Sequence, residues 1–244
     1  EKNNFRIPKK LFTEKEDGEK ISIFEGRSET AEAYFIAGKC KELIENGVVS
    51  EDMAVLYRAN FQSRVLEEAF LSLNVPYQML GTKFFERKEV KDVMSYIKAS
   101  INPENLSDFL RIINTPTRGI GKTTTDKIVA GKENELPETA KIKIHNFRRM
   151  LLNFKDILFS QKLSESIKHI IKSSGMEDLY STGVEEDNER LENIMELVSM
   201  AKEYDENEPE NALEEFLTDT ALSSDQDNLT EKKKGVKLMT VHSS

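Results

Sequence analysis

The sequence contains a single cysteine, Cys40, and only three histidines, which lie far apart at His145, His169 and His242. One cysteine cannot build a disulfide framework or a cysteine-based zinc site, and the histidines lack the spacing of metal ligands. We therefore predict no metal site in this chain. The sequence also lacks any apolar run near the ~18 residues of a membrane-spanning helix, and its start has no signal-peptide pattern. We expect a soluble protein of the cytoplasm.

The 244 residues are 38% hydrophobic and 32% charged, which is enough apolar material for a folded core of one large or two ordinary domains. The chain begins at Glu1 without a methionine and stops just after an apolar run. We read both ends as cut and expect a piece of a longer protein.

The net charge of −9 is spread unevenly along the chain. Residues 111–155 hold ten Lys and Arg against four Asp and Glu, whereas residues 176–227 hold two against eighteen. Such asymmetry indicates separate faces with separate partners. The basic block is the part suited to phosphate. The acidic block is typical of a solvated helical surface.

The first hundred residues alternate between strand and helix patterns. Short apolar runs predict strands at residues 20–24, 53–57 and 76–80. Apolar residues at helical spacing predict a helix after each strand, the first capped by Ser28. Strands that alternate with helices are typical of an α/β layer with a parallel sheet.

From about Asn102 to Asn228 the pattern is helical, with four apolar stripes, and residues 235–241 return to strand character. The simplest interpretation is a helical subdomain inserted into an α/β domain whose sheet regains its last strand at the end. We place the α/β part at residues 1–103, the helical insert at 104–230 and the return strand at 231–244.

Residues 119–123, Gly-Ile-Gly-Lys-Thr, end like a phosphate-binding loop. That motif needs a further glycine five positions before Gly121, where this chain has Pro116, which has no amide N–H. A tight glycine turn between two helices fits better. Arg118 and Lys122 flank the turn, and Thr123 to Thr125 can cap the next helix, whose first amides attract anions. A nucleic-acid phosphate contact and a purely structural turn both remain open.

Tyr57 ends the predicted strand 53–57 and Arg58 follows it directly, on the edge where parallel sheets bind ligands. The ring can stack on a base, and the guanidinium can stabilise charge on a transferring phosphoryl group. The alternative is a tyrosine that covers the sheet and an arginine paired with a nearby glutamate. Thr240 and His242 end the last strand, where a polar ligand contact and a structural role both fit.

Four segments, in this order, resemble motifs of the UvrD/PcrA/Rep-type superfamily 1 DNA helicases, and of their PcrA branch in particular. Residues 55–64 resemble motif IV, and residues 84–92 resemble motif IVa. Residues 110–121 resemble the opening of the accessory subdomain, and residues 238–244 the first part of motif V. The resemblance implies a second RecA-like motor domain, here partial, with an inserted all-helical accessory subdomain.

The resemblance also implies an ATP-dependent enzyme that moves 3′ to 5′ on single-stranded DNA and separates duplex in repair or replication. Tyr57 would stack on adenine, and Arg58 would be an arginine finger on the γ-phosphate. The other implied contacts are with DNA. They are Thr240 and His242 on the single strand, Phe84, Arg87 and Lys88 in the tracking motif, and Arg118, Gly119, Ile120, Gly121, Lys122 and Thr123 on duplex phosphates.

The chain departs from that family by lacking Walker A and Walker B residues, the end of motif V and motif VI. ATP and Mg²⁺ would thus be held largely by a first motor domain outside this piece, and we expect the piece alone to be inactive. Implied partners are that domain, single-stranded and duplex DNA, and repair or replication proteins, near the bacterial nucleoid. The motor of a helicase–nuclease and a non-enzymatic DNA- or partner-binding module are the alternatives.

Overall fold

A computed structural model describes residues 18–58, 61–80, 83–230 and 234–241, without the side chains of 223–230. The strands are β1 (Ala54–Tyr57), β2 (Tyr77–Leu80) and β3 (Val236–Thr240). The first helices are α1 (Glu29–Glu45), α2 (Gln62–Ser72), α3 (Lys88–Ile101), α4 (Leu106–Ile112) and α5 (Lys122–Val129). The later ones are α6 (Glu138–Leu158), α7 (Leu163–Ser173), α8 (Met176–Tyr180), α9 (Glu185–Ala201) and α10 (Pro209–Thr230). Short 3₁₀ turns are η1 (Ser50–Asp52), η2 (Phe84–Glu86), η3 (Glu133–Glu135) and η4 (Lys202–Tyr204).

The strands form one parallel sheet in the order β1-β3-β2. The last strand in sequence is therefore the central one, which confirms the prediction that the chain returns to the first sheet after the helical insert. Gly235 makes this possible, since a Cβ there would lie 2.6 Å from the backbone of Pro76 and Tyr77. Only a residue without a side chain lets β3 enter so close to the start of β2.

The sheet and helices α1 and α2 share one apolar core, which includes Ala37, Phe70 and Leu238. The start of α1 follows the sequence prediction, because the Ser28 hydroxyl accepts a hydrogen bond from the amide of Ala31 at 3.1 Å. The prediction of a strand at residues 20–24 is wrong. That segment has no regular secondary structure and pairs with no strand among the described residues, and Ile21 and Ile23 are 95% exposed.

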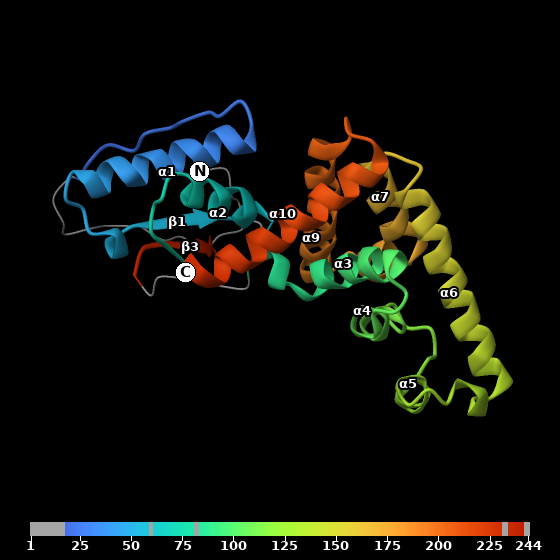
Figure 1. Cartoon of the computed structure of the whole chain (residues 1–244). Helices are drawn as coiled ribbons and strands as arrows, with labels where there is room; N and C mark the ends of the chain where they lie inside the picture. Colours follow the sequence, from blue (N-terminus) through green and yellow to red (C-terminus); the bar gives the residue numbers. More distant parts are fainter. Residues whose placement is uncertain (1–17, 59–60, 81–82, 231–233, 242–244) are drawn as a thin grey trace.

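Helices α3 to α10 build a second, larger core, whose fully buried side chains include Tyr96, Phe154, Ile167 and Phe216. Figure 1 shows the sheet with α1 and α2 at one end of the molecule and α6 at the other, with α10 running back toward the sheet. Helix α3 packs in this helical core, although the predicted division at residue 103 places it in the α/β part. The packing favours a division between Leu80 and Phe84.

The two cores share no buried residue. None of the described helices is at once long and apolar enough to cross a membrane.

Candidate nucleotide and nucleic-acid interfaces

The carboxyl ends of β1 and β3 bring two predicted site segments together. Tyr57 and Thr240 are register partners on neighbouring parallel strands, and Arg58 directly follows β1. In a parallel sheet these strand ends lie on the same edge, where open α/β sheets bind ligands. Thr240 is half-buried there. His242 lies outside the described residues.

Tyr57 lies in the α/β core rather than on its surface. The residue is 7% exposed, and its hydroxyl donates a hydrogen bond to Sδ of Met79 at 3.2 Å. Burial raises the pKa of the Tyr57 phenol to about 12, since the charged form is poorly solvated there. Tyr57 also lines a hollow at this edge, and its stacking on adenine remains a prediction.

Arg58 is exposed at the sheet edge, and its backbone amide donates a hydrogen bond to Oε1 of Gln62 at 3.1 Å. A hollow of about 220 Å³ opens beside it, between α1 and α2, with Glu29 and Glu32 on its wall. Among the residues that the structure describes, Arg58 is the only cationic side chain that lines this hollow. It offers one guanidinium to an anionic ligand but no second group to hold a triphosphate.

The described residues contain no cluster of three or more His, Cys, Asp or Glu that could hold a metal ion. The Arg58 guanidinium at the sheet edge fits one contact to a nucleotide phosphate.

The second candidate interface is the turn between α4 and α5, at the tip of the helical part. The side chain of Asn114 organises this turn, because its Oδ1 accepts from the amides of Arg118 at 2.7 Å and Ile120 at 3.2 Å. Gly119 has φ of +68°, a conformation that favours glycine. Ile120 is 2% exposed and anchors the turn in the helical core, so only its backbone can meet a ligand.

Arg118 is fixed within the protein. Its guanidinium donates to the carbonyls of Ile112, Pro116 and Ser174 at 3.1, 3.0 and 2.8 Å, and to the Tyr96 hydroxyl at 2.6 Å. The same group lies over the rings of Tyr96 and Phe147. These contacts join the turn to the ends of α4 and α7, which is a structural role for Arg118. A contact between Arg118 and duplex DNA remains a prediction.

The start of α5 presents the groups most accessible to phosphate. Gly121 is the N-cap and no side chain caps the helix, so the prediction that Thr123 to Thr125 supply the cap is wrong. The first amides of a helix have no intrahelical acceptor and attract anions. Lys122 and Thr123 are exposed at this end.

Lys143 of α6 also belongs to this turn, which the sequence could not indicate. Its Nζ donates to the carbonyl of Gly119 at 3.1 Å. A Cβ on Gly119 would lie 2.5 Å from the same nitrogen.

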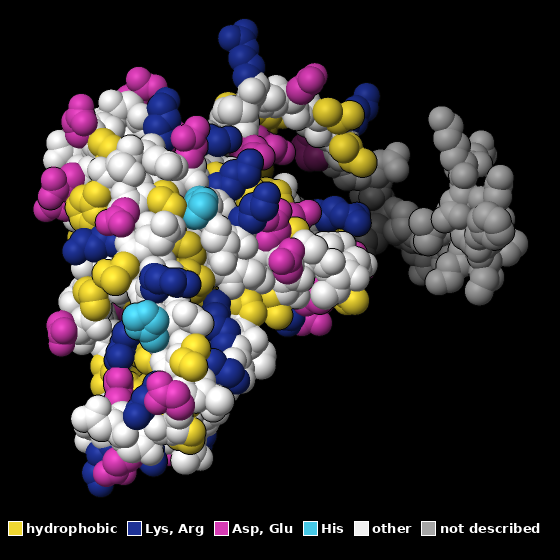
Figure 2. All heavy atoms as spheres, turned by 90° about the vertical axis from the view of Figure 1, so that its right-hand side faces the viewer, with side chains coloured by type: hydrophobic (Ala, Val, Ile, Leu, Met, Phe, Trp, Pro, Cys, Tyr) yellow, Lys and Arg dark blue, Asp and Glu magenta, His cyan; other side chains and the backbone are white. Residues whose placement is uncertain are grey.

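Lys and Arg side chains are distributed over the face of the molecule that carries α6 (Figure 2). Arg148 of α6 forms two hydrogen bonds with the Glu133 carboxylate, at 2.7 and 2.5 Å. Arg149 is exposed on the same helix. The basic block is thus partly neutralised by its own acidic residues, while Lys122, Lys143 and Arg149 are exposed cations outside that ion pair.

The motif IVa segment has a mostly internal role in this structure. Phe84 is 2% exposed and Arg87 is 6% exposed, while Lys88 is exposed at the start of α3. The Arg87 guanidinium donates to Oδ1 of Asn193 at 2.9 Å and to Oγ of Ser63 at 3.1 Å, and it lies over the Phe84 ring. Burial lowers the pKa of Arg87. Contacts of these three residues with DNA remain predictions.

The chain thus combines a small parallel sheet, with an exposed arginine at its carboxyl edge, and a helical insert with a glycine turn. The UvrD-like helicase C-terminal domain family matches residues 1–150 and 135–244. The chain belongs to this family.

Bacterial helicases align with nearly the whole chain. It is 36% identical over 268 residues to an ATP-dependent DNA helicase PcrA of Bacillus subtilis, and 35% identical over 266 residues to one of Staphylococcus aureus. It is also 34% identical over 263 residues to a DNA helicase II of Haemophilus influenzae. Each alignment covers 99% of this chain but only 36% of the relative. The chain therefore spans about a third of the length of these relatives.

Proposed function

We propose that this chain is the second motor domain, with its accessory subdomain, of an ATP-dependent DNA helicase. The parent protein moves 3′ to 5′ along single-stranded DNA and separates duplex during repair or replication, in the bacterial cytoplasm at the nucleoid. The observation that carries the proposal is the sheet edge, where Arg58 is exposed beside the register pair Tyr57 and Thr240. The names and coverage of the PcrA relatives support it.

Arg58 has the position of an arginine finger. It follows the carboxyl end of β1, and its backbone is held by Gln62 at the first turn of α2. A guanidinium there can meet charge that develops on a phosphoryl group held by another domain. ATP with Mg²⁺ supplies the phosphoryl-transfer chemistry when bound, and the Walker residues that hold it come from the first motor domain of the parent.

The glycine turn is the proposed duplex contact. The free amides at the start of α5 and the ammonium groups of Lys122 and Lys143 suit phosphate oxygens and read no base sequence. Arg118 stabilises the turn through its hydrogen bonds to the carbonyls of Ile112, Pro116 and Ser174. Binding of this kind releases counterions and weakens steeply with salt.

The test is strand separation by the purified parent protein on duplexes with a single-stranded tail. We expect ATP-dependent unwinding of a duplex with a 3′ tail, and little unwinding of the same duplex with a 5′ tail. A parent protein that binds DNA but neither hydrolyses ATP nor separates strands would contradict the proposal and favour a non-enzymatic binding module.

A further inference from the structure

Buried polar contacts on helix α9 join the two parts of the chain that the structure describes. Arg64 of α2 donates from Nε to Oε1 of Glu196 at 2.9 Å. Arg87 bridges Ser63 of α2 and Asn193 of α9. We call this set of residues, together with Glu89, the α9 joint.

The joint is buried and specific. Ser63, Arg87 and Asn193 are 0%, 6% and 3% exposed, and the side chain of Glu196 is 8% exposed. Asn193 uses both ends of its amide, since Oδ1 accepts from Arg87 and Nδ2 donates to Oε1 of Glu89 at 2.7 Å. Buried polar groups of this kind fix one geometry, because any other arrangement leaves a polar atom unpaired.

The joint contacts the turn of α2 that also holds Arg58. Gln62, which accepts from the Arg58 amide, is followed directly by Ser63 and Arg64, the two residues held from α9 and α3. A short helical turn is stiff, so displacement of Ser63 and Arg64 also displaces Gln62 and the backbone of Arg58.

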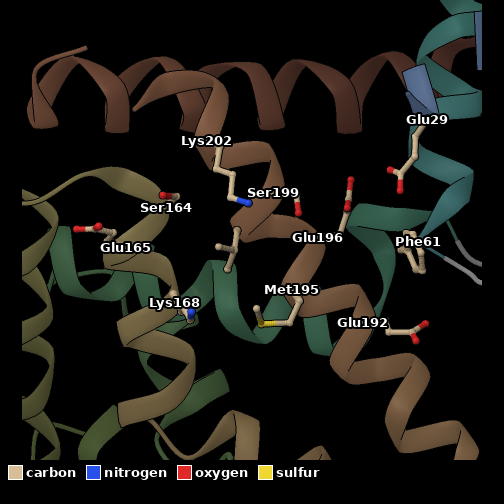
Figure 3. Close-up of a pocket in the computed structure, with 11 residues that line it drawn as sticks. Glu29, Phe61, Ser164, Glu165, Lys168, Glu192, Met195, Glu196, Ser199 and Lys202 are labelled. Atoms are coloured by element: carbon tan, nitrogen blue, oxygen red, sulfur yellow. The ribbon is translucent and has the colours of Figure 1, made fainter. Parts of the chain in front are cut away.

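An open cleft of about 590 Å³ lies beside the joint, between the α/β part and the helical part. Figure 3 shows Glu29 and Phe61 on one side of it, α7 residues on the other and Glu196 of α9 in between. The cleft leaves open space between the two parts at this place. The joint residues provide buried polar contacts that hold the first turn of α2 against α9.

We propose that Asn193 and Glu196 are positioning residues for the arginine finger: through Arg87 and Arg64 they set the first turn of α2 and thereby the place of Arg58. This inference rests on the proposed function of the parent as an ATP-driven motor. Neither residue touches nucleotide or DNA in this scheme. Their effect is on the transition state, where a displacement of about 1 Å can cost up to about 100-fold in rate.

The test uses the full-length parent with Glu196→Gln, which keeps the size of the side chain but removes its charge. We expect DNA-stimulated kcat at saturating single strand to fall about 10-fold, with the KM for ATP changed less than about 2-fold, because the finger acts mainly in the transition state. The matched control is Glu192→Gln, the same change four residues earlier at an exposed position of α9. We expect its kcat to stay within about 2-fold of the wild type.

A double-mutant cycle separates positioning from a general loss of stability. In Arg64→Gln with Glu196→Gln, kcat should be no lower than in the worse single variant, because both changes break the Arg64–Glu196 contact and only Arg64→Gln also removes the ion pair with Glu68. Glu196→Asp should restore part of the rate. A folded Asn193→Leu variant tests the Arg87 side of the joint independently, and we expect its kcat to fall while its KM for ATP changes little.

Three outcomes would overturn the proposal while leaving the motor function intact. They are an active parent with unchanged kcat in Glu196→Gln, an equal loss in Glu192→Gln, and strictly multiplicative losses in the cycle. A wild-type parent without DNA-stimulated ATPase activity would instead contradict the proposed function itself.

Discussion

Replacing Arg118 by alanine in the 244-residue chain tests whether the glycine turn depends on that side chain for its shape. The guanidinium makes four hydrogen bonds and lies over two aromatic rings. At about 1 kcal/mol for each bond and about 0.5 kcal/mol for each ring, the upper total is near 5 kcal/mol. Because the side chain is half-buried and water replaces part of this, we expect the free energy of unfolding to fall by about 3–4 kcal/mol.

The measurement is urea unfolding followed by circular dichroism at 222 nm. Arg118→Lys should recover little of the loss, because an ammonium cannot reach four acceptors in the plane of a guanidinium fork. Lys122→Ala is the matched control, an exposed cation in the same turn, and should change stability by less than about 0.5 kcal/mol. A loss below about 1 kcal/mol in Arg118→Ala, with a large drop in duplex affinity, would refute the structural role and return Arg118 to the DNA interface.

Further expectations concern the DNA contact, an ion pair and the isolated piece. Lys122→Glu should weaken duplex binding equally for unrelated DNA sequences, as measured by fluorescence anisotropy. It should also reduce the slope of log K against log salt concentration by about 0.9 or more, and an unchanged slope would show that Lys122 contacts no phosphate. The hydrogen bond from Arg148 lowers the pKa of Glu133, so the pair stabilises the fold above the ordinary glutamate pKa of 4.5 and loses this effect as the pH falls below it. Glu133→Gln should thus cost about 0.5–1 kcal/mol at pH 7 in urea unfolding and almost nothing near pH 3, and a cost independent of pH would argue against the pair. The 244-residue chain should show no ATPase activity with or without DNA, since it lacks Walker residues, and DNA-stimulated turnover by the pure chain would overturn the domain assignment.

Much of the fold was predictable because its signals are local. The short apolar runs that became β1, β2 and β3 are bounded by turn residues, and the helices follow apolar stripes with a period of 3.6 residues. The run at residues 20–24 carries a similar signal but pairs with no described strand, and a strand needs a partner that its own residues cannot specify. The stripe of α3 likewise predicts a helix but does not say which core receives it.

The candidate sites were also only partly predictable from the sequence. The strand pattern predicted the place of Arg58 after β1, and the glycines predicted the turn at residues 119–121, while the roles of both stay predictions. The partners of Arg118, Arg148 and Lys143 could not be predicted, since they come from helices distant in sequence. Asn193 and Glu196 lie in the acidic block that we interpreted as a solvated surface. The sequence pattern that could have indicated their burial is that each directly precedes an apolar residue, Ile194 or Leu197, on the buried side of α9.

The most direct test of the central claim is the DNA-stimulated ATPase activity of the full-length parent with Arg58→Ala, measured at saturating single strand. If Arg58 is an arginine finger, kcat should fall by roughly 10³-fold or more while the KM for ATP moves much less, because the side chain meets charge that grows in the transition state. Arg58→Lys should rescue poorly, since an ammonium cannot reproduce the planar fork. A near-normal kcat in Arg58→Ala, with a native circular dichroism spectrum, would contradict the claim and leave Arg58 as an exposed arginine at the sheet edge.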